Sequence, residues 1–213
     1  ALVPTKEIII TADRFIDGIQ LLHIGPKTDK EYAAELEKEQ LSLIHNIGEH
    51  YNYDAKHARQ VERLALAMFD KLSKSHGMDS HCRTLVQATA LLHDIGKYIS
   101  MRSHSLYTYK LIMSTDILGF SDDDKKIVAL ASYYHANQLF ENKAGSPEMA
   151  KELTPLVAKI AALVRLADAM DRSYQQKIKL CKVSVKDGTM RIEAKSKVDL
   201  TLEEWTFDGK AVF

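Results

Sequence analysis

The chain has 213 residues with 29 basic and 29 acidic side chains, and 46% of its residues are hydrophobic. This length suits one or two domains with a sizeable core, and the composition excludes disordered and collagen-like chains. A net charge of zero argues against a broad surface for DNA, although it is compatible with a local basic pocket. The chain has no apolar run of the ~20 residues that a membrane helix needs and no signal peptide at its start, so we expect a cytoplasmic protein with no membrane partner.

The first part of the chain is expected to be a connecting piece followed by a helix. Residues 1–27 predict a short strand and then a helical turn or two. Thr28 and Glu31 form a capping-box pattern, which predicts the start of a helix that runs towards Tyr51.

The next two helices are marked by aspartates at their starts. Asp54 is the expected N-cap of a helix that ends just before Gly77, and its apolar residues recur with the spacing of a core-facing stripe. Asp79 is the expected N-cap of a helix that closes at residues 93–96. Residues 104–113 are expected to continue helically.

Two further helices are predicted before residue 175. Ser121 is the expected N-cap of a helix that ends near His135, and residues 136–146 are expected to form a polar loop. Pro147 then marks the expected first turn of the longest helix, which ends near Arg172.

After Ile178 the period of the apolar residues changes from about 3.6 to 2. Residues 179–185 and 189–194 flank an Asp-Gly pair, which is typical of a β-hairpin. Residues 198–213 are expected to add another strand or two and a short helical piece. The predicted fold is therefore mainly α, a helical bundle with a small C-terminal β appendage.

Four places in the predicted helices have an ionisable side chain where the pattern calls for an apolar one: His57, His93-Asp94, His135 and Asp168. Each has a structural explanation when it is taken alone. A single histidine on an apolar face is more often a hydrogen-bonded core residue than a metal ligand. A buried Asp168 costs several kcal/mol unless it is paired, and Arg165 or Arg172 is near enough in sequence to pair with it.

Taken together, these residues favour a metal site. Imidazole and carboxylate groups suit divalent Zn, Mn, Fe or Co, and three histidines with two aspartates are enough for one or two such ions; Mg is a further candidate. A bound cation would supply the counter-charge that all four positions lack.

The segment Leu91-Leu92-His93-Asp94-Ile95-Gly96-Lys97, with a histidine before it and an aspartate after it, resembles the HDIG variant of the HD superfamily of metal-dependent phosphohydrolases. The resemblance implies that the metal ligands are His57, His93, Asp94 and Asp168. In members with two ions, histidines from the intervening helices bind the second one, and His104 and His135 are the candidates here. The resemblance does not extend to the cyclic-di-GMP phosphodiesterase branch, because no GYP-type motif follows His135.

A closer resemblance covers nearly the whole chain. It is carried by four segments, His104-Ser105-Leu106-Tyr107, Leu118-Gly119-Phe120-Ser121, Tyr133-Tyr134-His135 and the stretch from Leu163 to Ser173. These segments are similar to the C-terminal half of the exopolyphosphatase/guanosine pentaphosphate phosphatase (Ppx/GppA) family. The resemblance implies three parts: residues 1–27 as the tail of a preceding actin-like domain that this chain lacks, or a linker; 28–175 as a helical HD domain; and 176–213 as a β-rich subdomain.

This resemblance leaves two functions open. In the family the phosphate-releasing site belongs to the actin-like domains, and several members have lost the metal ligands of the helical domain. This chain keeps all four HD positions. The first candidate is therefore a phosphohydrolase acting on a phosphate ester or phosphoanhydride. The second is a non-catalytic module that binds polyphosphate or a phosphorylated nucleotide, or joins two subunits into a homodimer.

The first candidate assigns a role to each residue of the expected active site. The metal would lower the pKa of a bound water and polarise a phosphoryl oxygen. Asp94 would orient that water or accept its proton. Lys97 and Arg165 would neutralise phosphate charge in the transition state, although Lys97 is equally well explained as a solvated lysine at the C-terminus of a helix.

The second candidate is motivated by the basic side chains between residues 177 and 197, which could form a face for polyphosphate or a nucleotide. Solvated lysines on the strands of the hairpin are the more common explanation of such a run.

Overall fold

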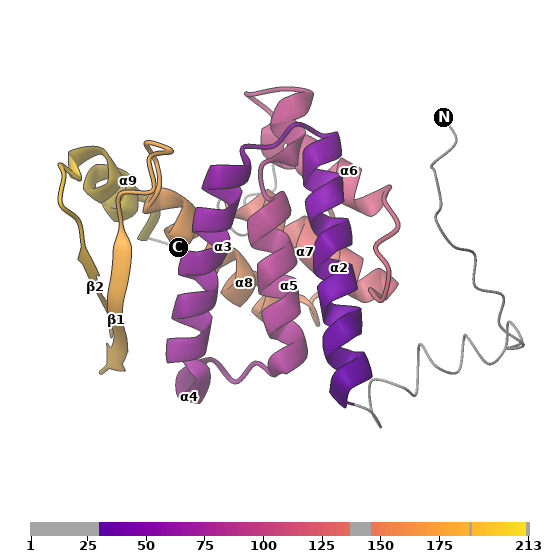
Figure 1. The fold of residues 1–213 in the computed structure, drawn as a ribbon, viewed down its shortest axis with the longest axis horizontal. Coiled ribbons are helices and arrows are strands. Elements are labelled where there is room, and N and C mark those ends of the chain that lie inside the picture. Colours follow the sequence, from indigo (N-terminus) through magenta and orange to yellow (C-terminus); the bar gives the residue numbers. More distant parts are fainter. Residues whose placement is uncertain (1–29, 137–145, 188, 212–213) are drawn as a thin grey trace, which may run out of the picture. The chain divides into compact units, whose positions relative to one another are not determined.

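The structure is a computed structural model that describes residues 30–136, 146–187 and 189–211 (Figure 1). The chain divides into two compact units, Ala1–Leu41 and Ser42–Phe213. The second unit contains every residue of the candidate site and is the one described below. The strand expected within residues 1–27, the capping box at Thr28 and most of the loop expected at 136–146 lie outside the described residues.

The described chain is mainly helical, as the sequence predicts. Its helices are α2 (Lys30–His50), α3 (Ala55–Lys71), α4 (Ser73–His76), α5 (Ser80–Leu92), α6 (His104–Met113), α7 (Asp122–Tyr134), α8 (Thr154–Ala169) and α9 (Thr201–Ala211). A single turn of 3₁₀ helix, η1 (Ile95–Tyr98), connects α5 to the segment before α6. No helix in the described ranges is long and apolar enough to cross a membrane.

Local hydrogen bonds set the starts of three helices. The side chain of Asp54 accepts from the backbone N–H groups of Lys56 and His57, and that of Asp79 accepts from the backbone of Cys82. Ser121 begins α7 with a reciprocal capping box. These contacts satisfy amide groups that have no partner inside the helix, so the three predicted N-caps are confirmed.

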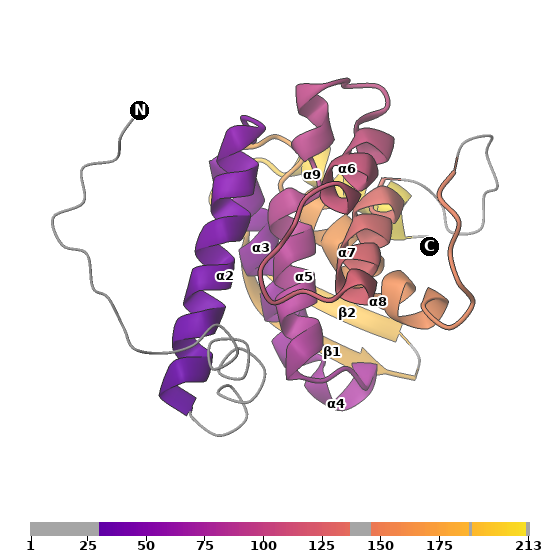
Figure 2. The same cartoon turned by 90° about the vertical axis from the view of Figure 1, so that its right-hand side faces the viewer.

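The core lies among α3, α5, α7 and α8. Helix α5 lies between α3 and α7, while α8 packs against all three (Figure 2). Their buried faces carry large aliphatic side chains such as Leu64, Leu92, Leu130 and Ile160, each at most 1% exposed. Removal of this apolar surface from water is the main term that stabilises the bundle.

Helix α8 begins later than the sequence predicts. The expected start at Pro147 is wrong, because residues 146–150 have no regular structure and the helix starts at Thr154, with Pro155 in its first turn. A helix that began at Pro147 would hold Pro155 in its interior, where proline removes a backbone hydrogen bond and clashes with the preceding turn. At 16 residues α8 is also shorter than α2, which has 21.

Two other helix ends differ from expectation. Helix α3 ends at Lys71, and the separate turn α4 leads to Gly77, whose left-handed backbone (φ 65°) stops the helical path. Helix α5 ends at Leu92 rather than continuing through residues 93–96, so His93 and Asp94 lie in the connection between α5 and η1. A connection of this kind can direct both side chains towards the same space.

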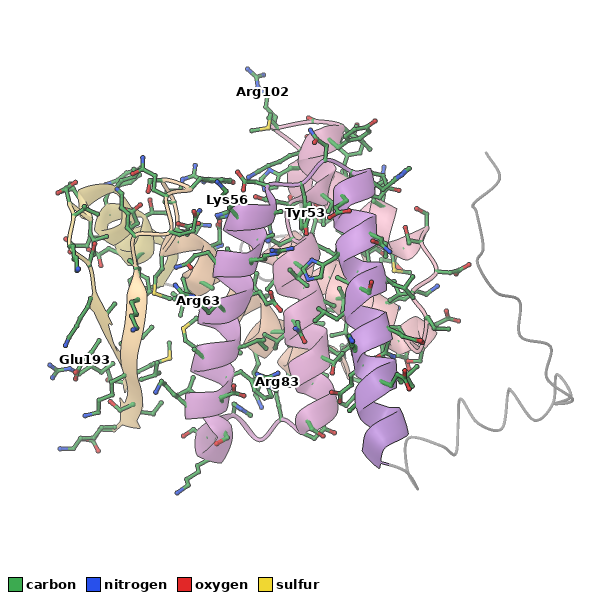
Figure 3. All side chains as sticks on the ribbon, in the orientation of Figure 1. Tyr53, Lys56, Arg63, Arg83, Arg102 and Glu193 are labelled. Atoms are coloured by element: carbon green, nitrogen blue, oxygen red, sulfur yellow. The ribbon has the colours of Figure 1, made fainter. Side chains whose placement is uncertain are left out.

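The C-terminal part combines a hairpin with a helix. Strands β1 (Lys179–Lys186) and β2 (Thr189–Lys195) pair antiparallel, with Val183 opposite Ile192, which confirms the predicted hairpin. Arg63, labelled in Figure 3, reaches from α3 and donates a hydrogen bond of 3.1 Å to the carbonyl of Ile178 just before β1. The further strand expected after residue 198 is wrong for the described residues, because 201–211 form α9, which packs against α8.

Candidate metal centre

Three packed helices bring the four predicted HD residues together. His57 lies in the first turn of α3, where the Asp54 cap sets the backbone; His93 and Asp94 follow α5 directly; Asp168 lies in the last turn of α8. Because α3, α5 and α8 all contact one another, the four side chains meet in the interior. His57, His93 and Asp168 are buried.

The imidazoles and carboxylates face each other at short range without hydrogen bonds between them. Nε2 of His57 lies 3.2 Å from Oδ1 of Asp168 and 3.9 Å from Oδ2 of Asp94. Nε2 of His93 lies 3.3 Å from Oδ2 of Asp94 and 3.9 Å from Oδ1 of Asp168. One ligand atom from each residue lies within 4.8 Å of the other three, which is a spacing that a single ion can bridge.

The second nitrogen of each ring determines which way the ring presents its lone pair. Nδ1 of His57 donates to Oδ2 of Asp171 at 2.9 Å, and Nδ1 of His93 donates to the carbonyl oxygen of Ala90 at 2.8 Å. Within the described chain both Nε2 atoms are buried and have no hydrogen-bond partner. Because buried polar atoms are normally paired, two inward-facing Nε2 atoms without partners beside two carboxylates fit a bound cation.

The electrostatics of this group also favour a cation. Burial opposes a charge on His57, but the carboxylates of Asp168 and Asp171 outweigh burial and raise its pKa to about 9. Without an ion, Nε2 of this ring therefore carries a proton, which a bound cation would displace. Burial alone would raise the pKa of Asp168, yet the neighbouring His57 and Lys210 hold it well below its usual range. The pKa of Asp94 is likewise held well below its usual range, so the Asp94 and Asp168 carboxylates are ionised and attract positive charge.

Asp94 also faces a second set of imidazoles. Its Oδ1 lies 3.6 Å from Nε2 of His104 and 3.9 Å from Nε2 of His135, so the three residues form a second group with the spacing of a metal site. Nδ1 of His104 donates to the carbonyl of Met101 at 3.1 Å, and Nδ1 of His135 donates to that of Ser132 at 2.5 Å. Both histidines therefore turn Nε2 towards Asp94, as His57 and His93 do.

Asp94 is shared between the two groups. Its Oδ2 faces the first pair of histidines and its Oδ1 faces the second pair. Burial lowers the pKa of His135 to about 3 and that of His104 below its usual value, so both rings are neutral near pH 7. A neutral imidazole is the form that binds a metal.

A glycine allows the second group to approach the first. A Cβ atom on Gly96 would lie 2.0 Å from the carbonyl oxygen of His104 and 2.4 Å from the amide nitrogen of Thr108. The N–H of Gly96 donates to the Thr108 hydroxyl at 2.9 Å, and this hydroxyl donates to the carbonyl of His93 at 3.1 Å. Close contact between η1 and α6 thus places His104 beside Asp94.

The two predicted phosphate-binding residues lie in different surroundings. The Lys97 ammonium contacts Oδ2 of Asp94 and the hydroxyl of Tyr174, so it stands at the site. Arg165 is 7% exposed, and its guanidinium donates to the carbonyls of Lys210 at 3.1 Å and His135 at 3.2 Å. These contacts tie the end of α9 to the end of α7.

Sequence reasoning missed three residues that contact the site. Asp171 orients His57, and its three-residue spacing from Asp168 was the available signal. Lys210 contacts Oδ2 of Asp168. The sequence suggests Arg165 or Arg172 as the cation that pairs with Asp168, and nothing in it points to Lys210. The hydroxyl of Tyr174 donates to Oδ2 of Asp94 at 3.0 Å, which no periodic pattern reveals.

Tyr174 is held in an unusual backbone conformation. Its φ is +60° and that of Gln176 is +50°, a region that costs residues other than glycine about 1–3 kcal/mol each. The backbone N–H of Gln176 donates to Oδ1 of Asp171 at 2.6 Å. The ring of Tyr174 stacks on the ring of His57, with centroids 3.8 Å apart. The turn after α8 is thus held against His57, a candidate metal ligand.

Two cavities adjoin the candidate metal ligands. One has a volume of about 370 Å³ and is lined by the tyrosines at positions 51, 53 and 98. The other has a volume of about 700 Å³ and is lined by His104, His135 and one face of α9. Asp94, Lys97 and Tyr174 line both cavities and form the partition between them.

A comparison with known protein families assigns this chain to a family. The model of the Ppx/GppA phosphatase family, domain III, matches residues 41–207, a range that includes all the residues of both candidate metal groups. The match covers more than half of the chain. The chain therefore belongs to the Ppx/GppA phosphatase family, and its residues 41–207 correspond to domain III of that family.

Proposed function

We propose that this domain carries a two-ion metal centre that hydrolyses a phosphate ester or phosphoanhydride with metal-activated water. Membership of a phosphatase family supports a hydrolase at the level of the family. The proposal of a metal centre rests mainly on the buried Nε2 atoms of His57 and His93. Both atoms point at carboxylates, and neither has a hydrogen-bond partner in the described chain.

The donor set supports particular metals. The first group offers two imidazoles and two carboxylates, and the second offers two imidazoles and the shared Asp94. Mixed nitrogen and oxygen ligands favour divalent Mn, Fe, Co or Zn over Mg, which prefers oxygen ligands. When bound, such ions lower the pKa of a coordinated water towards neutrality and polarise a phosphoryl oxygen.

The protein groups around the ligands have complementary tasks. Asp94 bridges the two groups and lies where it can orient the attacking water or accept its proton. Asp171, through its hydrogen bond to Nδ1, keeps His57 in the tautomer that presents Nε2. Lys97 contacts Asp94 and lines both cavities, a position from which its ammonium can neutralise phosphoryl charge.

The test is the metal content of the purified chain, measured by mass spectrometry. We expect up to two equivalents of a transition metal in the wild type and loss of metal in a His93→Ala, Asp94→Ala double variant. A matched control is His81→Ala, which removes a histidine that contacts an aspartate, Asp124, at 2.7 Å on the surface. Metal-dependent phosphate release should follow the metal content. A wild type that stays empty after exposure to each metal would refute the proposal.

A second function is favoured by one observation, the exposed basic side chains of the hairpin. Lys182, Lys186, Arg191 and Lys195 are all exposed on its two strands. If polyphosphate bound to this hairpin, the domain would be a non-catalytic module that binds the polymer, and the phosphatase site would belong to the actin-like domains of the family. Polyphosphate binding at low salt that is lost in a Lys182→Ala, Lys186→Ala variant would support this function. Undetectable binding at low salt would exclude it.

A further inference from the structure

One wall of the larger cavity is a single face of α9. Leu202, Trp205, Thr206 and Lys210 all line it, and their spacing of three, one and four residues keeps them on one side of the helix. The opposite wall carries His104 and other candidate metal ligands. A molecule that reacts at the metal centre from this cavity must therefore lie against α9.

The wall is firmly attached to the metal centre. The buried guanidinium of Arg165 joins the carbonyl of Lys210 on α9 to that of His135, a candidate ligand. At the other end of α9, Glu203 accepts hydrogen bonds from the backbone N–H and the hydroxyl of Ser173, and its carboxylate pairs with Lys177. The helix is thus held in place at both ends, so the cavity is preformed.

Three cations surround the space next to the candidate ligands. Lys97, Arg172 and Lys210 line the cavity, and the two lysines already contact Asp94 and Asp168. An ammonium group has three donors, so each lysine can hold its carboxylate and still donate to an oxygen of a phosphoryl group. This end of the cavity suits a phosphate.

The other end of the same wall suits a flat apolar group. Trp205 is the only tryptophan of the chain and is 76% exposed, and Met101 and Leu202 beside the same cavity are also exposed. Exposed apolar side chains that gather at a cavity mark a place where a ligand covers them. An indole is a stacking platform for aromatic rings, and inorganic polyphosphate has no ring to place on it.

We infer that α9 is a specificity element that selects an organic phosphate with a planar ring, such as a nucleotide, over inorganic phosphate chains. The phosphoryl group lies among Lys97, Arg172 and Lys210, and the ring stacks on Trp205. The inference rests on the proposed function, since it places the substrate of that same metal centre. Lys210 lies beyond residue 207, where the match to the family model ends.

The test compares two non-hydrolysable probes on the metal-loaded protein by calorimetry. 1-Naphthylmethylphosphonate carries a planar ring of nucleobase size, and methylphosphonate carries the same anion without the ring. We expect the ring to tighten binding by a factor of about ten or more, as stacking on an aromatic side chain does. Trp205→Ala should abolish this preference and leave the affinity for methylphosphonate unchanged. Lys210→Met should weaken the binding of both probes alike.

Tyr98→Ala is the matched control, because Tyr98 is a 64% exposed aromatic residue of the smaller cavity. Loss of the preference in Tyr98→Ala but not in Trp205→Ala would overturn the inference by placing the ring in the other cavity. Quenching of the single tryptophan by the naphthyl probe, but not by methylphosphonate, is a second expected readout.

Metal content measured on the same samples separates the two proposals. Normal metal content without any preference for the ring, or without binding of either probe, overturns only the inference about α9. A preference for the ring in a protein that takes up no metal overturns only the proposed hydrolysis.

Discussion

Nδ1 of His57 and Oδ2 of Asp171 lie 2.9 Å apart, and both side chains are at most 1% exposed. The two residues are 114 positions apart in the chain. Because Asp171 holds the proton of this ring on Nδ1, Nε2 is left as the ligand atom. Asp171 therefore decides the orientation of His57, a candidate ligand, although Asp171 itself belongs to neither candidate metal group.

Asp171→Ala should weaken metal binding while leaving all the candidate ligands in the sequence. Residues that orient a metal-bound histidine typically contribute a factor of 10–100 to metal affinity. We expect a loss of about this size when the variant and the wild type compete with a chelator of known affinity. Circular dichroism should first confirm that the variant is folded. An unchanged affinity in a folded variant would show that His57 does not depend on this partner.

The shared position of Asp94 predicts a specific stoichiometry. If the wild type binds two equivalents of metal, His135→Ala should retain about one, because the first group of ligands does not include His135. Asp94→Ala should lower the occupancy of both positions, because each group uses one of its oxygens. Mass spectrometry of the dialysed variants measures the difference. Equal losses in the two variants would contradict a shared carboxylate.

Two glycine-to-alanine variants should have opposite effects on stability. In Gly96→Ala the new Cβ would lie 2.0 Å from the backbone of His104, which cannot give way, and we expect a loss of at least ~2 kcal/mol. In Gly209→Ala the new Cβ meets nothing within 4 Å, and we expect a gain of about 0.5–1 kcal/mol from the higher helix propensity of alanine. Urea unfolding measures both. An unchanged free energy of unfolding in Gly96→Ala would contradict the close packing of η1 on α6.

Glu203 predicts a pH dependence of stability at a position outside both candidate metal groups. Burial would raise the pKa of this carboxylate, but its hydrogen bonds with Ser173 and its pairing with Lys177 lower it below 4.5. A lowered pKa in the folded state stabilises the fold above pH 4.5, and this contribution is lost as the pH falls through the lowered pKa. Glu203→Gln should therefore destabilise the protein by about 2 kcal/mol at pH 7.

The same difference should shrink as the solution is acidified. Thermal unfolding of the wild type and of Glu203→Gln from pH 7 down to pH 3 measures this change. A gap in stability that stays constant over this range would mean that the carboxylate is not ionised in its contact with Ser173 and Lys177.

Sequence alone was sufficient for features that depend on neighbours a few residues apart. The caps at Asp54, Asp79 and Ser121 and the pairing of the hairpin are such features. Their hydrogen bonds or register depend on the local backbone, so residue type and spacing indicate them. The HDIG segment belongs here too, since its four residues are consecutive. The start of α8 was misjudged because two prolines competed for its first turn.

Only the tertiary structure decided which distant side chains meet at the site. Asp171 reaches His57, and Lys210 reaches Asp168 from a helix that had been expected in part as strand. Trp205 carried no signal in the sequence, yet α9 places it in the lining of the larger cavity. Such contacts arise from the packing of whole helices, which no local periodicity encodes. The sequence identified the candidate ligands, and the packing of α8 and α9 determined what surrounds them.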